Sequence, residues 1–166
     1  MRLRDLRAKA EKWFRESFRQ RLWRALNYYA RSAASFEFII PQRPVSQQTR
    51  RRARLRDWRD FVADHARAAF GNRPLLTDTA LAIRLLYFYE EAALDADNIV
   101  KPIQDALVNV IFPDDSLITD IEVRRRWLRT SFAIGDVSPT LATGLDLKRE
   151  FIYVVIDQAP PQDVLP

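Results

Sequence analysis

The 166-residue sequence contains no cysteine, only three glycines and a single histidine. The absence of cysteine excludes disulfide bonds and thiolate zinc sites, and it fits a reducing cytosol. No apolar run reaches the length of a membrane-spanning helix and no signal-peptide core is present, so we expect no membrane association. Few glycines and 48% hydrophobic residues are typical of one folded domain with a substantial core.

Lysine is also scarce, since only four of the 27 basic residues are lysines. Residues 1–73 hold 19 Arg or Lys and 7 Asp or Glu, a net +12, whereas residues 74–166 hold 8 and 15, a net −7. A basic half attracts polyanions and an acidic half can hold cations. The pattern favours a protein that binds nucleic acid with one part and metal with another. A soluble protein with uneven surface charge fits the charges equally well.

Apolar residues recur every three or four positions from Leu3 to Tyr29, which predicts an amphipathic basic helix over residues 1–34. Its apolar stripe is too large to leave in water. The candidates to cover it are its own domain, a second subunit, a membrane surface or another protein. We favour packing on its own dimer with the arginines outward, and we expect a separate domain over residues 35–166.

Alternating and continuous apolar runs predict four strands in the second domain. The predicted strands are 35–41, 80–89, 117–128 and 151–157. One helix is expected from Ser46 or Thr49 to Phe70, with Gly71 as its C-cap. Another is expected over 98–110, and a loop over 135–144 carries one helical turn begun by Ser138-Pro139. This order predicts an α/β (α+β) fold with a mixed four-stranded sheet flanked by helices.

Five aspartates and one lysine fall within residues 95–115. Asp95 and Asp97 leave the end of the long central strand, Lys101 follows one helical turn later, and Asp114-Asp115 lead into the next strand. Clustered carboxylates repel one another unless a cation neutralises them. Carboxylate oxygens are the ligands that Mg²⁺ or Mn²⁺ prefers, and such an ion can activate water toward a phosphodiester. A lysine beside it can stabilise the charge that develops on the phosphate.

Ordinary structural roles fit the same spacing. Asp97 or Asn98 can be a helix N-cap, and Asp114-Asp115 after a proline can form a turn. Asp97, Lys101 and Asp105 can form surface ion pairs one helical turn apart. Lone His65 beside an apolar stripe favours a structural role, because no nucleophile pairs with it.

The segment from Asp95 to Ile118 resembles the RusA-type Holliday junction resolvases, small homodimeric endodeoxyribonucleases of bacteria and their phages. The resemblance extends loosely over residues 35–157. Asn109 stands where many relatives have glycine, and asparagine tolerates the left-handed conformation that such a turn needs. The matching residues are Asp95, Asp97, Asn98, Lys101, Asp105-Ala106-Leu107 and Asp114-Asp115.

The resemblance implies a cytoplasmic, nucleoid-associated enzyme that resolves four-way junctions or other branched DNA in recombination and repair, as a homodimer with Mg²⁺ or, as a substitute, Mn²⁺. Asp95, Asp97 and Asp115 would bind the ion, Lys101 would be the catalytic lysine, and Asp114 would assist. The alternatives are a RusA-like module that binds DNA or protein without catalysis, and a flap or RNA nuclease of the same chemistry. The residues expected to hold DNA phosphates are Arg50, Arg51, Arg52, Arg54, Arg56, Arg124, Arg125 and Arg126.

Overall fold

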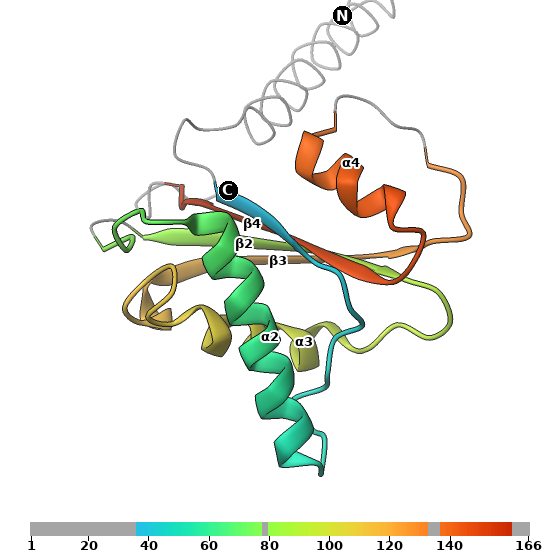
Figure 1. Cartoon of the computed structure of the whole chain (residues 1–166), viewed down its shortest axis with the longest axis horizontal. Helices are drawn as coiled ribbons and strands as arrows, with labels where there is room; N and C mark the ends of the chain where they lie inside the picture. The colour runs from blue at the N-terminus through green and yellow to red at the C-terminus, as the bar shows by residue number, and fades with distance from the viewer. Residues whose placement is uncertain (1–35, 78–79, 133–136, 161–166) are drawn as a thin grey trace, which may run out of the picture. The chain divides into compact units, whose positions relative to one another are not determined.

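A computed structural model describes residues 36–77, 80–132 and 137–160 (Figure 1). The helix expected over residues 1–34 lies outside the described residues, so its packing stays a prediction. Within the described ranges, none of the helices is both long enough and apolar enough to cross a membrane.

The four expected strands form one sheet in the order β1-β4-β2-β3. They are β1 (Phe36–Ile40), β2 (Leu81–Tyr89), β3 (Ile118–Trp127) and β4 (Phe151–Gln158). β2 and β3 are parallel, whereas β4 runs antiparallel to both β1 and β2. The predicted mixed four-stranded sheet is therefore confirmed.

Two helices cover one face of the sheet and a third covers the other (Figure 1). They are α2 (Arg52–Phe70) and α3 (Ala96–Leu107) on the first face and α4 (Pro139–Asp146) on the second. Leu81, Ile83, Leu85 and Tyr87 of β2 are completely or almost completely buried in the core that contains α2 and α3, and Phe88 on the opposite face is buried as well. The apolar stripe of α2 covers this core. The helix ends at Gly71, as predicted, and Gly71 has a positive φ of 65°.

The third helix is longer than the single turn expected from the sequence. Ser138 begins it as predicted, because its Oγ accepts a hydrogen bond from the Leu141 N–H at 3.0 Å and Pro139 follows at the first helical position. The helix then continues to Asp146 because its inner side packs on the sheet. A side chain at Gly144 would collide with the Phe151 ring, so the close approach requires glycine.

Helix α3 begins at Ala96 and ends at Leu107, earlier at both ends than the expected 98–110. Pro102 is consequently the seventh residue of the helix and lies in its interior. A proline has no N–H for the carbonyl four residues earlier, which here is that of Asn98. The backbone N–H of Gln47 donates to that carbonyl at 3.0 Å instead. The proline-punctuated loop before α2 is thereby tied to the helix that carries the acidic motif.

Beyond α3 the chain turns sharply before β3. Asn109 adopts φ 60°, the left-handed conformation expected at this position from its replacement of glycine. A short 3₁₀ helix, η1 (Asp115–Leu117), then leads into β3. The sequence offered an ordinary turn at Asp114-Asp115, but not the 3₁₀ helix that follows Asp114.

Candidate active site

Two of the predicted site acids lie at the start of α3. Asp95 occupies the N-cap position in an extended conformation, but its side chain makes no capping hydrogen bond. Asp97 lies in the first turn, so the alternative that Asp97 or Asn98 is the N-cap is wrong. Both aspartates are exposed, and within the described residues neither carboxylate takes part in a hydrogen bond or an ion pair. Their oxygens therefore face solvent.

Lys101 lies between two further acids of the motif. Its Nζ donates to Asp115 Oδ2 at 2.5 Å and to Asp105 Oδ1 at 2.9 Å. The hydrogen bonds to Asp115 and then to Asp105 raise the pKa of Lys101, which therefore stays an ammonium ion at neutral pH. The predicted surface pair of Lys101 and Asp105 is thus present. Asp105 also lies 2.6 Å from the Nη2 of Arg59, which links α3 to α2.

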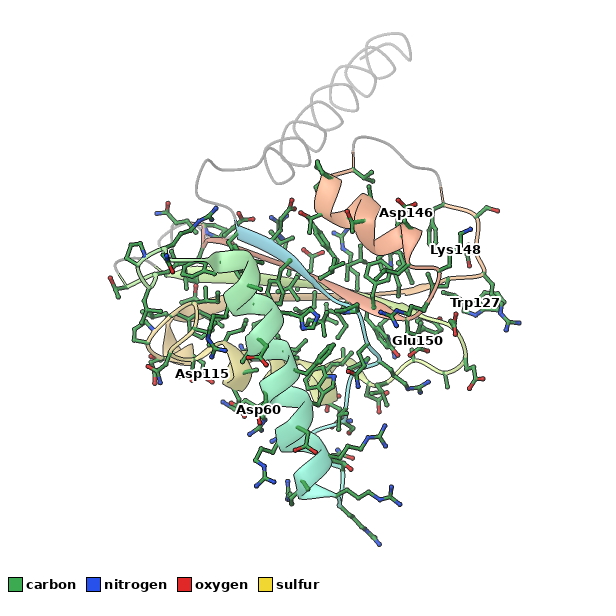
Figure 2. The ribbon with its side chains drawn as sticks, viewed as in Figure 1. Asp60, Asp115, Trp127, Asp146, Lys148 and Glu150 are labelled. Carbon is green, nitrogen blue, oxygen red and sulfur yellow. The ribbon has the colours of Figure 1, made fainter. Side chains whose placement is uncertain are left out.

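Asp114 and Asp115 flank the start of η1. The Oδ1 atom of Asp114 accepts a hydrogen bond from the Ser116 N–H at 2.9 Å, and this bond lowers the pKa of Asp114. Asp114 thus caps the short helix, which is the turn role that the alternative reading gave it. Asp115 comes next and is half-buried; Figure 2 labels it beside α3. The cap fixes the backbone from which Asp115 reaches Lys101.

The donor set fits a hard divalent cation, because it consists only of carboxylate oxygens. The structure brings Asp115 and Asp105 to Lys101, and Asp97 precedes Lys101 by one helical turn. Across the described residues, however, no three histidine, aspartate or glutamate side chains lie close enough together to hold a metal ion. The convergence of Asp95, Asp97 and Asp115 on one ion therefore stays a prediction.

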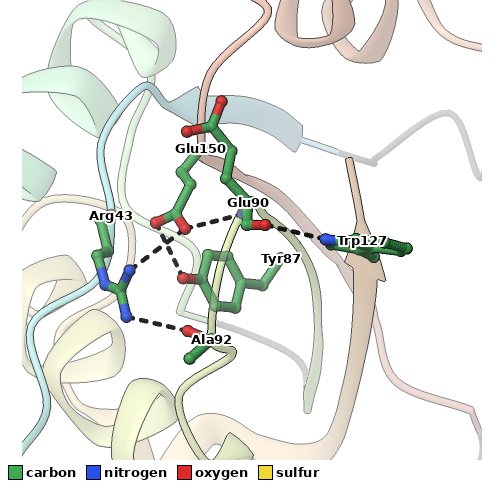
Figure 3. Close-up of polar contacts among 6 residues, drawn as sticks. All are labelled: Arg43, Tyr87, Glu90, Ala92, Trp127 and Glu150. Carbon is green, nitrogen blue, oxygen red and sulfur yellow. Dashed lines mark hydrogen bonds and ion pairs between the residues drawn. The ribbon is translucent and has the colours of Figure 1, made fainter. Parts of the chain in front are cut away.

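A second acidic centre lies near the connection between β2 and α3 (Figure 3). Glu150 precedes β4, and its side chain is only 10% exposed. Its carboxylate accepts hydrogen bonds from the Glu90 N–H at 2.9 Å, the Tyr87 hydroxyl at 3.1 Å and Arg43 Nη1 at 3.4 Å. Burial and, after it, the charge of Glu150 raise the pKa of Tyr87.

The same group of residues fixes residues 90–92, where the connection from β2 to the acidic motif begins. Arg43 Nη2 donates to the Ala92 carbonyl at 2.9 Å, and Trp127 Nε1 donates to the Glu90 carbonyl at 2.9 Å (Figure 3). We call Arg43, Tyr87 and Glu150 the Glu150 brace. It fixes residues 90–92, which lie three residues before Asp95. An open cavity of about 430 Å³ adjoins it, lined by Pro41, Gln42, Arg43, Glu90, Glu91, Arg149 and Glu150.

The arginines expected to hold DNA fall into two groups. The first surrounds the start of α2; all five are exposed, and they are Arg50, Arg51, Arg52, Arg54 and Arg56. The second lies on β3, where neighbouring residues point to opposite faces. Arg125 Nη1 donates to the Leu94 carbonyl at 3.2 Å, directly before Asp95. Arg124 and Arg126 lie on the α4 side of the sheet, opposite the acidic motif.

A comparison of the sequence with models of known protein families identifies the family to which this fold and its acidic motif belong. The family model described as Endodeoxyribonuclease RusA matches residues 41–133, which is more than half of the chain and contains the whole motif. The chain belongs to the RusA family. Members of this family are bacterial and phage endodeoxyribonucleases that resolve Holliday junctions, and they generally depend on a divalent metal ion. No curated protein matches the chain.

Within this RusA-family fold, the sequence interpretation missed the Glu150 brace. Arg43 and Glu150 are 107 residues apart, so no local spacing connects them. The one available signal was a single acid directly before the apolar run 151–157, flanked by Arg149. It also missed Arg59, whose contact with Asp105 depends on how α2 crosses α3.

Proposed function

We propose that this RusA-family protein is a Mg²⁺-dependent endonuclease that cuts four-way DNA junctions in recombination and repair, in the cytoplasm near the nucleoid. Mn²⁺ is the expected substitute for Mg²⁺. One observation carries the proposal. Lys101, the basic residue of the motif, is held by Asp115 and Asp105 one turn after Asp97, whose carboxylate has no partner in the part of the chain that the structure describes. Asp95 and Asp97, exposed and without partners among the described residues, leave carboxylate oxygens available to a cation.

Asp95, Asp97 and Asp115 are the residues that would hold the ion. When bound, the ion supplies Lewis-acid stabilisation of the phosphodiester and lowers the pKa of water. Asp114 orients Asp115 by capping η1. The Lys101 ammonium is available to offset negative charge on the scissile phosphate or on the leaving oxygen, since it carries its proton at neutral pH.

The exposed arginines at the start of α2 are suited to bind DNA phosphates. The Gln47–Asn98 hydrogen bond ties their loop to α3, so phosphates held there keep a fixed relation to the motif. Arg125, beside Leu94, is suited to contact a phosphate close to Asp95. Such contacts position the DNA without reading its sequence. A homodimer would present two such sites related by a two-fold axis, which suits the cutting of two strands in one junction.

A cleavage assay on a synthetic four-way junction tests the proposal directly. The linear duplexes that make up its arms serve as the substrate control, and each reaction is run with Mg²⁺, with Mn²⁺ and with a chelator. We expect paired nicks in the junction that require the metal. Asp60→Asn, which removes an exposed aspartate of α2, is the matched protein control. Metal-independent cutting, or preference for a flap or for RNA over the junction, would overturn the assignment.

A further inference from the structure

Strand β3 forms one edge of the sheet. It is ten residues long, from Ile118 to Trp127, and among the described residues it pairs only with β2. A long edge strand presents unpaired N–H and C=O groups, which invite pairing with another chain. Two of the four large hydrophobic residues exposed in the described part of the chain lie on it: Ile121 is 51% exposed and Trp127 is 45% exposed. The edge thus combines a side that pairs with no other described strand with uncovered apolar surface.

The charges on one face of β3 follow a self-complementary order. Asp120, Glu122, Arg124 and Arg126 occupy alternate positions and therefore share the face that lies opposite α2 and α3. Reading along the strand gives acid, acid, base, base. In an antiparallel pair, directly opposite residues on one face are neighbours. Two copies of this strand that meet at Val123 would pair Asp120 with Arg126 of the second copy, and Glu122 with Arg124.

The register at Val123 is the one that brings only opposite charges together. A two-fold axis at Glu122 would oppose two glutamates, and an axis at Arg124 would oppose two arginines. Shifts by an odd number of residues are excluded, because they would place the charged face of one copy beside the helix-covered face of the other.

The helix-covered face of β3 fits the same register. Val123 would meet its own copy at the two-fold axis, and the exposed Ile121 would lie against the aliphatic part of Arg125. Residues of this face continue the packed side of β2, because Ile121 pairs with Ile83 and Val123 pairs with Leu85. Pairing would therefore extend the hydrophobic layer across both copies and cover Ile121.

We propose that β3 is the subunit interface, and that two copies of this chain join their β3 strands antiparallel about Val123 into one continuous eight-stranded sheet. The inference rests on the homodimer proposed above and adds its interface. It assigns Arg124 and Arg126 to subunit contact rather than to DNA, and leaves Arg125 beside the acidic motif. An isologous interface of this kind closes on itself and leaves no further edge at β3.

Charge reversal on the full chain tests the interface. One variant carries Asp120→Arg and Glu122→Arg, so that its strand is entirely basic; the other carries Arg124→Glu and Arg126→Glu, so that its strand is entirely acidic. Like charges opposed across an interface cost several kcal/mol, so each variant alone should dimerise at least about 100-fold more weakly than the wild type. An equimolar mixture should form a one-to-one heterodimer. A protein with all four substitutions should form a homodimer again. Sedimentation equilibrium measures each state.

Several results would overturn the interface. The wild type could be monomeric, or each double variant alone could dimerise as strongly as the wild type. The mixture of the two double variants could also stay monomeric although circular dichroism shows that both are folded. If a double variant does not fold, Asp120→Arg and Arg126→Glu are mixed in its place and judged in the same way. Junction cleavage is measured on the same samples. A dimer that obeys the charge rule but cuts nothing supports the interface and refutes the nuclease, whereas cleavage by a dimer indifferent to these charges does the reverse.

Discussion

The two acidic centres of the molecule differ in how fully their carboxylates are satisfied. Glu150 is nearly buried and accepts from a backbone amide, a phenol and a guanidinium. Asp95 and Asp97 are exposed and, within the described residues, accept from no group. Buried polar groups are almost always hydrogen-bonded, so the donors around Glu150 are what a structural acid requires. Acids left open to solvent next to a lysine that is held in place are suited to bind a ligand.

The comparison also connects the two centres. The Glu150 brace fixes residues 90–92 through the Glu90 amide and the Ala92 carbonyl, and the chain reaches Asp95 three residues later. Asp115 lies in η1, which follows α3, whereas Glu150 directly precedes β4, and Figure 2 labels both residues. The motif is therefore held at both ends, by the brace before α3 and by the Asp114 cap after it. A site of exposed acids can be precise only if its supports are rigid.

The largest effect on cleavage is expected when Asp97, one of the two exposed acids at the start of α3, is substituted. Asp97→Asn removes one charge and one metal-ligand oxygen, so junction cleavage should fall by at least about 10²-fold. Because Asp97 is exposed, the free energy of unfolding should change by no more than about 0.5 kcal/mol. Junction binding without metal should hold or strengthen, since a negative charge facing phosphate is lost. Gel-shift, cleavage and urea-unfolding measurements check the three parts, and Asp60→Asn is the matched exposed control. Cleavage at the wild-type rate would exclude Asp97 from the site.

A change at the lysine should separate catalysis from metal binding. Lys101→Ala should lower cleavage by about 10²-fold, because the cation that offsets charge on the phosphate is removed. Metal affinity measured by calorimetry should be unchanged or higher, since Asp115 loses a competing partner. Lys101→Arg keeps the positive charge and should recover part of the activity. A loss of Mg²⁺ affinity in Lys101→Ala would instead assign the lysine to the architecture of the metal site.

A substitution in the Glu150 brace should mainly lower the free energy of unfolding and, to a smaller extent, raise the Mg²⁺ concentration that cleavage by the acidic motif requires. Glu150→Gln keeps an acceptor for the Glu90 amide but loses the charge opposite Arg43, which should cost about 1–3 kcal/mol of unfolding free energy. The freed linker should raise the Mg²⁺ concentration needed for half-maximal cleavage. Asp157→Asn is the matched control, because Asp157 is similarly enclosed at 15% exposure and pairs with Arg84 at the far end of β4. It should cost comparable stability without the shift in Mg²⁺ dependence. Equal shifts in both variants would show that the brace only stabilises the fold.

Local signals made much of this fold predictable. Alternation and apolar runs located all four strands, and Gly71 and Ser138 marked where helices end and begin. The left-handed Asn109 was predictable because asparagine tolerates a conformation that few other side chains adopt. Boundaries failed where packing overrides local preference. Helix α3 accommodates Pro102 in its interior because a distant N–H, that of Gln47, bonds the carbonyl that the proline leaves free.

The site was predictable only as a set of residues. The spacing of Lys101 and Asp105 on one helix was enough to predict their ion pair. The contact of Lys101 with Asp115 spans the end of α3 and the turn that follows it, so spacing could only suggest it. The partners of Glu150 come from three separate segments, and no periodicity in the sequence relates them. Contacts between residues of different elements could not be predicted from the sequence, because they depend on how the elements pack.

The smallest expected effect is a loss of unfolding free energy at alkaline pH, and it comes from Tyr87 in the Glu150 brace. Burial, and then the negative charge of Glu150, raise the pKa of Tyr87 in the folded protein, whereas Arg43 opposes this and Tyr89 adds to it. In the unfolded chain the phenol titrates near its ordinary pKa of about 10. Below that pH both states keep the proton, so the stabilisation is fully present. Above it the unfolded chain releases the proton while the folded chain retains it, so the free energy of unfolding falls as pH rises, by at most about 1.4 kcal/mol per pH unit from this group.

Tyr87→Phe should remove this part of the alkaline slope. Near pH 8 the variant should be less stable than the wild type by about 1 kcal/mol, because the hydrogen bond to Glu150 is lost. The difference should shrink as the pH rises from 10 toward 11, since only the wild type then pays for retaining the phenol proton. Glu150→Gln should reduce the slope only in part, because burial, the larger cause, remains. Urea unfolding at half-unit steps from pH 8 to pH 11 resolves the three curves. Parallel curves for wild type and Tyr87→Phe would show that Tyr87 contributes to the brace by packing alone.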